Sequence, residues 1–332
     1  MRSPVTGGEM EFKKGTRVLE FRKDNFTITF HYYKCKDTGE EYTTSESDTI
    51  NINQVYNQYR EKYGIPFTEE IINIRLNYGL SAAKMSEVLG LGANVYRNYE
   101  AGEIPSVATG RLIRLASDPV EFMRLLEMSK NVLEPHEYEK VKKKTLHAIS
   151  EANPEEETYK AWLFENKYPG IMNGYKTPDL QKIKRMIRFF AHHNAPFTTA
   201  LNKLMFYADF GHFKKTGFSI SGLCYKAIQR GPVPENYGGI YNYVVNTGFV
   251  AVEEMAFGEY VGERFVATEQ TDDPAFFSDS ELQMLKKVSD KFKGLSTKQI
   301  VDISHEEPAW KNNVDDHNRI SFDYGFELKN ID

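Results

Sequence analysis

The feature that most constrains the fold is a change in the spacing of apolar residues along the chain. Between residues 16 and 33 the pattern is that of β-structure, with Phe26, Ile28, Phe30 and Tyr32 at alternate positions. We expect Asp24-Asn25 to turn the preceding strand back into a hairpin with one apolar face. From Asn53 onward the spacing becomes helical, except for a two-stranded ribbon predicted at 249–268 and folded near Phe257-Gly258. The sequence therefore predicts an α+β fold that is mostly α.

Length and composition indicate about two globular domains. At roughly 150 residues per domain, the 332 residues with 40% apolar and 27% charged side chains are typical of a folded protein. A net charge of -5 excludes a chain that is basic throughout, so any DNA-binding face must be local. The two distant cysteines, Cys35 and Cys224, fit a reducing compartment. The chain start has no apolar signal core and no stretch is long enough to span a bilayer, so we expect a cytoplasmic protein without membrane contact.

Two short turns flank the N-terminal hairpin and have the spacing of zinc knuckles. The ligand positions of these turns carry three hydroxyls and one thiol, namely Ser3, Thr6, Cys35 and Thr38. A neutral hydroxyl is a poor zinc ligand and one thiolate cannot close a tetrahedral site. We therefore expect no metal and no stoichiometric zinc in purified protein. Two ordinary glycine-containing turns are the alternative interpretation.

Residues 53–129 predict a series of short helices. Thr68 is expected to cap a helix whose buried stripe is Ile71, Ile74 and Tyr78. Gly90-Leu91-Gly92 predicts a turn before a further helix from Ala93 to Ala101. Helix, short turn and helix is the geometry that places one helix in the major groove of DNA.

The first turns of that further helix carry residues suited to reading bases. The candidate DNA-binding residues are Asn94, Tyr96, Arg97 and Asn98. Asparagine can pair with adenine and arginine with guanine. An ordinary helical hairpin is the alternative, since five basic residues meet five acidic ones between Thr68 and Ser117. The lysine run at 140–144 is either a solvated helix face or a phosphate-binding surface.

Catalytic constellations are not supported by the sequence. His305-Glu306-Glu307-Pro308-Ala309 begins like a zinc-protease helix, but its fifth residue is not histidine and Pro308 would break the helix. The adjacent His192 and His193 cannot easily share one metal, and Cys224 is expected to be a small buried side chain. We expect neither an enzyme nor a cofactor; an enzyme acting through His305 and Glu306 is the least favoured hypothesis.

The helical segment resembles the helix-turn-helix of MqsA-type antitoxins. The matching residues are Leu80-Ser81, Glu87-Val88-Leu89-Gly90 and the run from Gly92 to Gly102. Asn94 matches the base-reading asparagine of that family. The companion arginine corresponds to Asn98, with Arg97 displaced by one position, and Ala82 replaces a common glutamine, so no operator sequence is implied. Ser3, Thr6, Cys35 and Thr38 match the family's zinc cysteines, which implies a degenerate zinc-ribbon.

The C-terminal part resembles the Panacea, or SocA-like, antitoxin domain. The resemblance rests on Lys203 to Ala208, Gly231 to Tyr237 and Ser304 to Trp310, and its candidate motif residues are Lys203, Tyr207, Gly231, Pro232, Glu235, His305, Glu306 and Trp310. We expect a scaffold role for these side chains, with Trp310 buried and His305 and Glu306 in a polar network; direct toxin contact is the alternative. The expected domains are a zinc-ribbon-like part at 1–52, a helix-turn-helix domain at 53–130, a helical linker at 131–176 and a Panacea domain at 177–332.

Together the two resemblances imply a type II antitoxin, a class that includes phage-defence systems. Its partners would be a cognate protein toxin, neutralised by direct binding, and operator DNA, bound by a possible homodimer. A mobile-element transcription regulator whose C-terminal domain binds a partner other than a toxin is the alternative.

Overall fold

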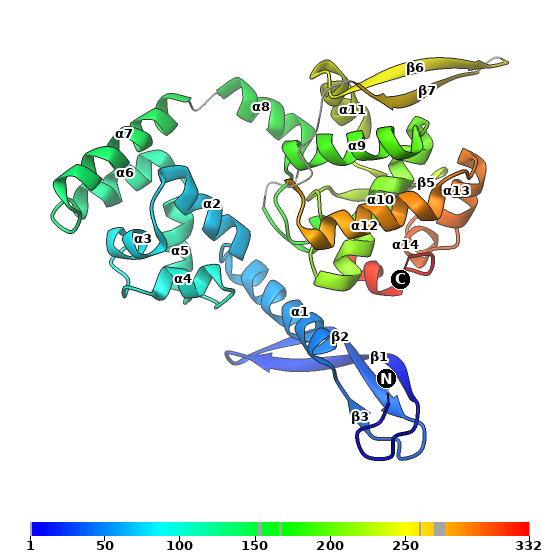
Figure 1. Cartoon of the computed structure of the whole chain (residues 1–332), viewed down its shortest axis with the longest axis horizontal. Coiled ribbons are helices and arrows are strands. Elements are labelled where there is room, and N and C mark those ends of the chain that lie inside the picture. Colours follow the sequence, from blue (N-terminus) through cyan, green and yellow to red (C-terminus); the bar gives the residue numbers. More distant parts are fainter. Residues whose placement is uncertain (1, 152–153, 166–167, 259, 269–275, 332) are drawn as a thin grey trace. The chain divides into compact units, whose positions relative to one another are not determined.

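The protein consists of two compact units, which are described separately (Figure 1). The computed structural model describes all residues except 1, 152–153, 166–167, 259, 269–275 and 332. Unit one contains Met1–Leu19, Thr27–Gln54 and Tyr159–Asp332, and unit two contains Glu20–Phe26 and Val55–Thr158. Helices make up 53% of the chain beside small antiparallel sheets, which confirms the predicted α+β, mostly α class. The predicted boundaries at 52, 130 and 176 stay predictions.

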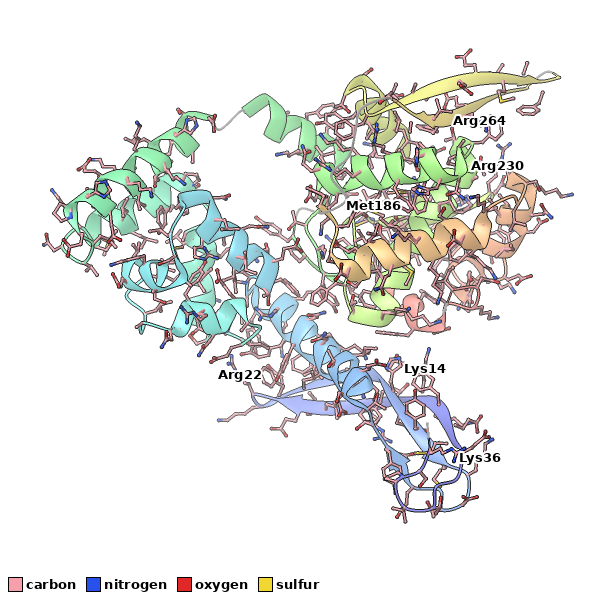
Figure 2. The ribbon with its side chains drawn as sticks, viewed as in Figure 1. Lys14, Arg22, Lys36, Met186, Arg230 and Arg264 are labelled. Atoms are coloured by element: carbon pink, nitrogen blue, oxygen red, sulfur yellow. The ribbon has the colours of Figure 1, made fainter. Side chains whose placement is uncertain are left out.

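The N-terminal hairpin has a tighter turn than expected. Strand β1 (Met10–Phe21) pairs with β2 (Asp24–Cys35), and β3 (Glu41–Tyr42) follows β2 in the sheet order. The turn is made by Arg22 and Lys23, both with positive φ (51° and 72°), so the prediction of a turn at Asp24-Asn25 is wrong. The Arg22 guanidinium (Figure 2) donates hydrogen bonds to the carbonyls of Ile104 and Pro105 at 2.6 and 2.8 Å, which holds this turn in place.

Unit two is a bundle of short helices around an apolar core. Helix α1 crosses the division between the units, and the other helices of this part of the chain follow it in order: α1 (Ser45–Tyr63), α2 (Thr68–Tyr78), α3 (Ala82–Val88), α4 (Val95–Glu100), α5 (Val107–Leu115), α6 (Pro119–Met128), α7 (Pro135–Glu151) and α8 (Pro154–Leu163), which reaches unit one. Tyr78 stacks on Phe122 at 3.6 Å, and both rings belong to the core. Ile71, Ile74 and Tyr78 are buried as predicted. The N-cap of α2 is Phe67 and not Thr68, because Glu70 accepts the free Phe67 N–H at 2.8 Å.

The C-terminal part of unit one is built around one buried helix. Its elements are η1 (Ile171–Asn173), α9 (Leu180–Asn194), α10 (Thr198–Thr216), β4 (Tyr225–Ile228), β5 (Gly231–Pro234), α11 (Tyr237–Asn246), β6 (Val250–Phe257), β7 (Tyr260–Ala267), α12 (Asp279–Phe292), α13 (Thr297–Ser304), α14 (Pro308–Lys311), β8 (Arg319–Ile320) and η3 (Phe322–Glu327). Helix α10 is buried along nearly its whole length and packs against α9, α12, α13, β5 and η3. It is therefore the central element of this domain.

The segment Gly231–Pro234 is strand β5 in spite of its two prolines. It lies at the edge of a sheet with the order β5-β4-β8 and pairs with β4 in antiparallel register. Proline has no N–H to donate, so an edge position tolerates Pro232 and Pro234. The turn precedes the strand, and Gly231 has φ +95°, a conformation that glycine adopts without strain.

The predicted ribbon near residue 257 is confirmed as the β6–β7 hairpin. The two strands pair from Val250 with Ala267 to Phe257 with Tyr260. In the described part of the chain, no helix combines the length and the apolar character that crossing a bilayer requires.

Candidate functional site

A buried polar network joins the three segments of the predicted Panacea motif. Tyr207 on α10 donates a hydrogen bond from its hydroxyl to Glu307 Oε1 at 3.1 Å. Glu307 also accepts from the backbone N–H groups of Lys329 and Asn330 at 2.9 and 3.1 Å and from Asn330 Nδ2 at 2.9 Å. Glu307 has no exposed surface. Its carboxylate therefore ties α10 and the start of α14 to the C-terminal segment.

The predicted role of Glu306 is corrected by this arrangement. Glu306 is exposed, whereas the neighbouring Glu307 is buried in the network. Glu307 is the N-cap residue of α14, and this position turns its side chain toward Lys329 and Asn330. Local sequence does not distinguish the two adjacent glutamates, because the partners of Glu307, Lys329 and Asn330, lie more than twenty residues further along the chain.

Lys203, one turn before Tyr207 on α10, is fully buried. Its ammonium nitrogen donates to the carbonyl of Pro232 at 3.1 Å, and burial lowers the pKa of Lys203 to about 7. A Cβ at Gly231 would lie 2.6 Å from Lys203 Cε and 2.5 Å from Ser304 Oγ. Glycine is thus required at residue 231 both by its backbone conformation and by this close approach. Lys203 therefore holds β5 against α10.

The remaining motif residues support the turn between β4 and β5. His305 stacks on Trp310 with ring centroids 3.7 Å apart, and Trp310 Nε1 donates to the carbonyl of Ile228 at 2.7 Å. Trp310 is half-buried rather than the fully buried anchor expected. Glu235 lies on the other side of β5, where it accepts from Arg319 Nε at 2.7 Å.

A second buried carboxylate, Asp209, escaped the sequence analysis. Asp209 Oδ1 accepts from the N–H groups of Ile220 and Ser221, both at 2.8 Å, and Oδ2 accepts from the hydroxyls of Ser221 and Tyr225. Burial raises the pKa of Asp209, although the four hydrogen bonds oppose this effect. The available signal was a single acidic residue within an apolar helix, Phe206 to Phe210. Asp209 fixes the loop that follows α10.

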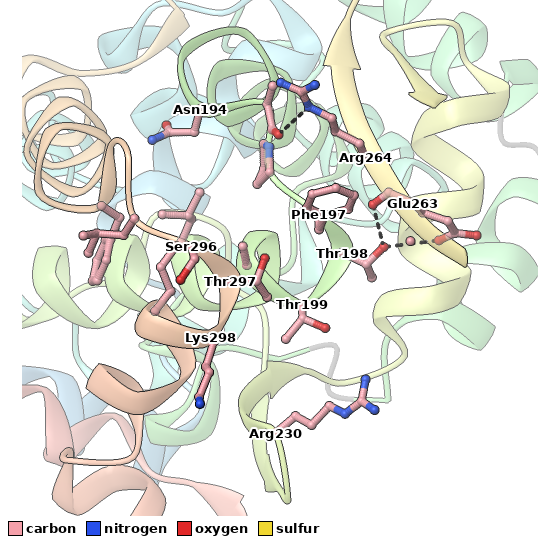
Figure 3. Close-up of a pocket in the computed structure, with 18 of the residues that line it drawn as sticks. Asn194, Phe197, Thr198, Thr199, Arg230, Glu263, Arg264, Ser296, Thr297 and Lys298 are labelled. Carbon is pink, nitrogen blue, oxygen red and sulfur yellow. Dashed lines mark hydrogen bonds between the residues drawn. The ribbon is translucent and has the colours of Figure 1, made fainter. Parts of the chain in front are cut away.

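An open groove of about 1450 Å³ lies beside this network (Figure 3). Its walls are the turn from α9 into α10, strand β7, the turn from α12 into α13, and Arg230 of the β4–β5 turn. Helix α10 begins at this groove. The N-cap is Phe197, which has no side-chain cap, and Thr198 Oγ1 donates to Glu263 Oε2 at 3.2 Å.

The segment predicted to be a helix-turn-helix exposes three of its four candidate DNA-binding residues on one face. Asn94 is the N-cap of α4, and Asn94, Arg97 and Asn98 are all exposed. None of these three side chains bonds to another described residue. Tyr96 differs from the prediction because it is fully buried and donates its hydroxyl to the Ile71 carbonyl at 2.7 Å. The i, i+3 spacing of Tyr96 and Tyr99, both buried, was the signal for a core face.

Most cations of the helix-turn-helix are already paired within the chain. Arg75 bonds Glu100 at 2.5 Å, Lys84 bonds Glu87 at 3.0 Å, and Arg114 bonds Glu70 at 2.5 Å. Within the described ranges, Arg97 and Arg111 are the two of the five basic residues between 68 and 117 that have no ion-pair partner, and both are exposed. The number of cations available to phosphates in this segment is therefore small.

The two N-terminal turns have matching backbone geometry. Gly7 N–H bonds the Ser3 carbonyl at 3.0 Å, and Gly39 N–H bonds the Cys35 carbonyl at 2.9 Å. Thr6 Oγ1 lies 3.6 Å from Cys35 Sγ, and hydrogen bonds, first that from the Thr38 hydroxyl, lower the pKa of the Cys35 thiol to about 6. Hydroxyls and a thiol thus bond one another at these positions. No cluster of three or more His, Cys, Asp or Glu that could hold a metal occurs among the residues described.

Comparison with known proteins supports the predicted family of the C-terminal domain. A family model described as "Antitoxin SocA-like, Panacea domain" matches residues 201–311. The matched segment runs from α10 through α14 and includes Lys203, Gly231 and Glu307. No curated protein and no solved structure matched the chain. The match covers about a third of the chain and indicates an antitoxin-like domain.

Proposed function

We propose that this protein is an antitoxin that neutralises a protein toxin by direct binding through its C-terminal domain. The observation that carries the proposal is the match of residues 201–311 to the SocA-like antitoxin domain. The buried side chains of Lys203, Tyr207 and Glu307 support a fixed surface suited to binding, because each bonds a partner inside the domain: Lys203 the Pro232 carbonyl, and Tyr207 the Glu307 carboxylate. Inhibition would then be stoichiometric, with the toxin's active surface covered.

We further propose that the helix-turn-helix binds operator DNA, as a homodimer on a two-fold site, and represses the operon of the chain. The support is the exposed face of Asn94, Arg97 and Asn98 on α4. These side chains have the donors and acceptors for base edges in the major groove. The apolar core behind them, which includes Tyr96 and Tyr99, would hold the short helix in place.

Co-expression tests the neutralisation. The gene beside that of this chain is induced alone, with the full-length chain, and with a chain carrying Glu307→Ala. We expect growth arrest with the neighbouring gene alone and recovery with the wild-type chain. Equal growth in the presence and absence of the wild-type chain would contradict neutralisation and favour a regulator that binds some other partner.

A further inference from the structure

The groove beside the buried network carries a positive charge that the chain as a whole does not. Its free cations are Arg230, Lys293 and Lys298, which form no ion pair with any described residue and are exposed. Arg264 adds a fourth cation and donates to the Ala195 carbonyl at 3.1 Å. The acidic side chains lining the groove are Glu254 and Glu263, of which Glu263 accepts from Thr198. In a chain of net charge -5, this surface attracts anions.

Helix dipoles add to this charge. Helix α10 begins in the groove at Thr198 without a side-chain cap, whereas α13 begins in it at Thr297 and is already capped by Ser296, whose hydroxyl accepts from the Gln299 N–H at 3.3 Å. The N-terminus of each helix carries a partial positive charge. Figure 3 shows Lys298 and Arg230 toward one end of the groove and Arg264 toward the other, with Phe197 between them.

The groove also presents apolar surface. Leu204, Phe292 and Ile300 are buried side chains that reach its lining. On the hairpin side, Phe257 and Val261 are 54% and 64% exposed. Phe197 packs against Phe257 at 5.4 Å, and a Cβ at Gly262 would lie 3.1 Å from the Phe197 ring. The absence of a side chain at Gly262 therefore lets the Phe197 ring lie against β7.

The buried network positions the cations of this groove. Lys203 and Trp310 bond the carbonyls of Pro232 and Ile228, on either side of the turn that carries Arg230. Ser304, the last residue of α13, lies against Gly231 at the start of β5, and the first turn of the same helix carries Lys298. Lys203 and Trp310 would thus affect the binding of a partner indirectly, by holding in place the turn that carries Arg230.

We propose that the groove receives an acidic segment of the toxin, in which carboxylates flank at least one large apolar side chain. This inference rests on the proposed antitoxin function. Its volume, about 1450 Å³, exceeds that of a typical small-molecule pocket, which fits a polypeptide segment better than a metabolite. Carboxylates of the segment meet the cations and the uncapped N-terminus of α10, and its apolar side chain covers Phe257 and Val261.

The test uses the full-length chain and the tagged product of the neighbouring gene. One variant combines Arg230→Glu with Lys298→Glu. Its control combines Lys215→Glu with Lys311→Glu, two exposed lysines of the same domain that do not line the groove, so that the net charge changes equally. Unfolding temperature verifies folding, and Kd is measured at low and high salt. A third variant, Val261→Ser, probes the apolar contact.

We expect the groove variant to raise Kd by at least about tenfold at low salt, the control to change it less than about threefold, and the difference to shrink at high salt. Val261→Ser should raise Kd by a few-fold at either salt concentration. Substituting lysines for carboxylates in the toxin segment should restore binding to the groove variant. If the wild-type chain binds and neutralises but the groove variant does so equally well, the groove assignment is overturned. If the wild-type chain neither binds nor neutralises, the proposed function fails first.

Discussion

The C-terminal domain buries its charged groups, whereas the helical segment at residues 68–117 keeps its charged groups near the surface. The C-terminal domain buries Lys203, Asp209 and Glu307 completely and satisfies them with internal hydrogen bonds. The segment at residues 68–117 has an apolar core and pairs its charges, such as Arg75 with Glu100, nearer the surface. Buried networks make one arrangement of segments necessary, whereas an apolar core leaves the polar face free for contact. The comparison therefore separates residues that hold a shape from residues that would touch a partner.

The largest expected effect is the loss of the Glu307 carboxylate. Glu307→Ala leaves the Tyr207 hydroxyl and two backbone N–H groups without their acceptor. We expect the free energy of unfolding to fall by about 3–5 kcal/mol, measured by urea denaturation. Glu306→Ala, one residue earlier and exposed, is the matched control and should change it by less than about 0.5 kcal/mol. Equal effects of the two variants would remove the distinction between these neighbours.

Removing the buried Lys203 should raise the free energy of unfolding at neutral pH, whereas removing Glu307 should lower it. Lys203→Met removes a group whose charged form is disfavoured by burial, at the loss of one hydrogen bond to Pro232. We expect the variant to be more stable than the wild type by about 1–3 kcal/mol near pH 7. Between its folded pKa of about 7 and its unfolded pKa near 10.5, the wild-type lysine binds more protons when unfolded. The stability of the wild type therefore rises with pH over this range, and the advantage of the variant shrinks.

That pH dependence distinguishes the network from ordinary packing. The difference between the two proteins should be constant below about pH 7 and decline toward pH 10.5 when unfolding is followed by circular dichroism at several pH values. A variant that is less stable than the wild type at pH 7 would show that the hydrogen bond from Lys203 to Pro232 and the packing of its side chain outweigh the cost of burying its charge.

In the helix-turn-helix, substitutions should separate stability from DNA binding. Asn94→Ala should weaken operator binding by about 1–3 kcal/mol, as expected for one bidentate base contact, and leave unfolding nearly unchanged. Tyr96→Phe is the converse control. Loss of its hydroxyl bond to Ile71 should lower stability by about 1 kcal/mol without changing DNA affinity in a mobility-shift assay. Identical shifts for wild type and Asn94→Ala would refute the assignment of Asn94.

The sequence predicted the parts of the fold that depend on local spacing. The stripe of Ile71, Ile74 and Tyr78 and the hairpin near Gly258 follow from the period of apolar residues, and both are present. Tyr96 was misplaced although its spacing with Tyr99 indicated a core face. A resemblance that names a whole segment does not say which side of its helix faces inward.

The remaining differences arise from contacts between residues far apart in the sequence. The turn falls at Arg22-Lys23, whose arginine bonds the carbonyls of Ile104 and Pro105. Glu307 replaces Glu306 in the network because its partners are Lys329 and Asn330. Rules based on neighbouring residues cannot identify partners this far apart in the sequence. The fold class was therefore predictable, whereas the hydrogen-bond partners within the candidate site were not.

The smallest expected effect is on the salt dependence of DNA binding, which reports how many cations of the protein contact phosphates. If Arg97 and Arg111, the unpaired arginines, are the cations that contact phosphates, the slope of log K against log salt should be about -2 per protomer. Arg97→Ala should reduce its magnitude by about one, whereas Arg114→Gln, which removes a partner of Glu70, should leave it unchanged. A slope near -5 would instead indicate that the lysines at 140–144 on α7 contact phosphates as well. A slope near -5 would therefore extend the DNA-binding surface from α4 to α7, because cations of both helices would then contact phosphates.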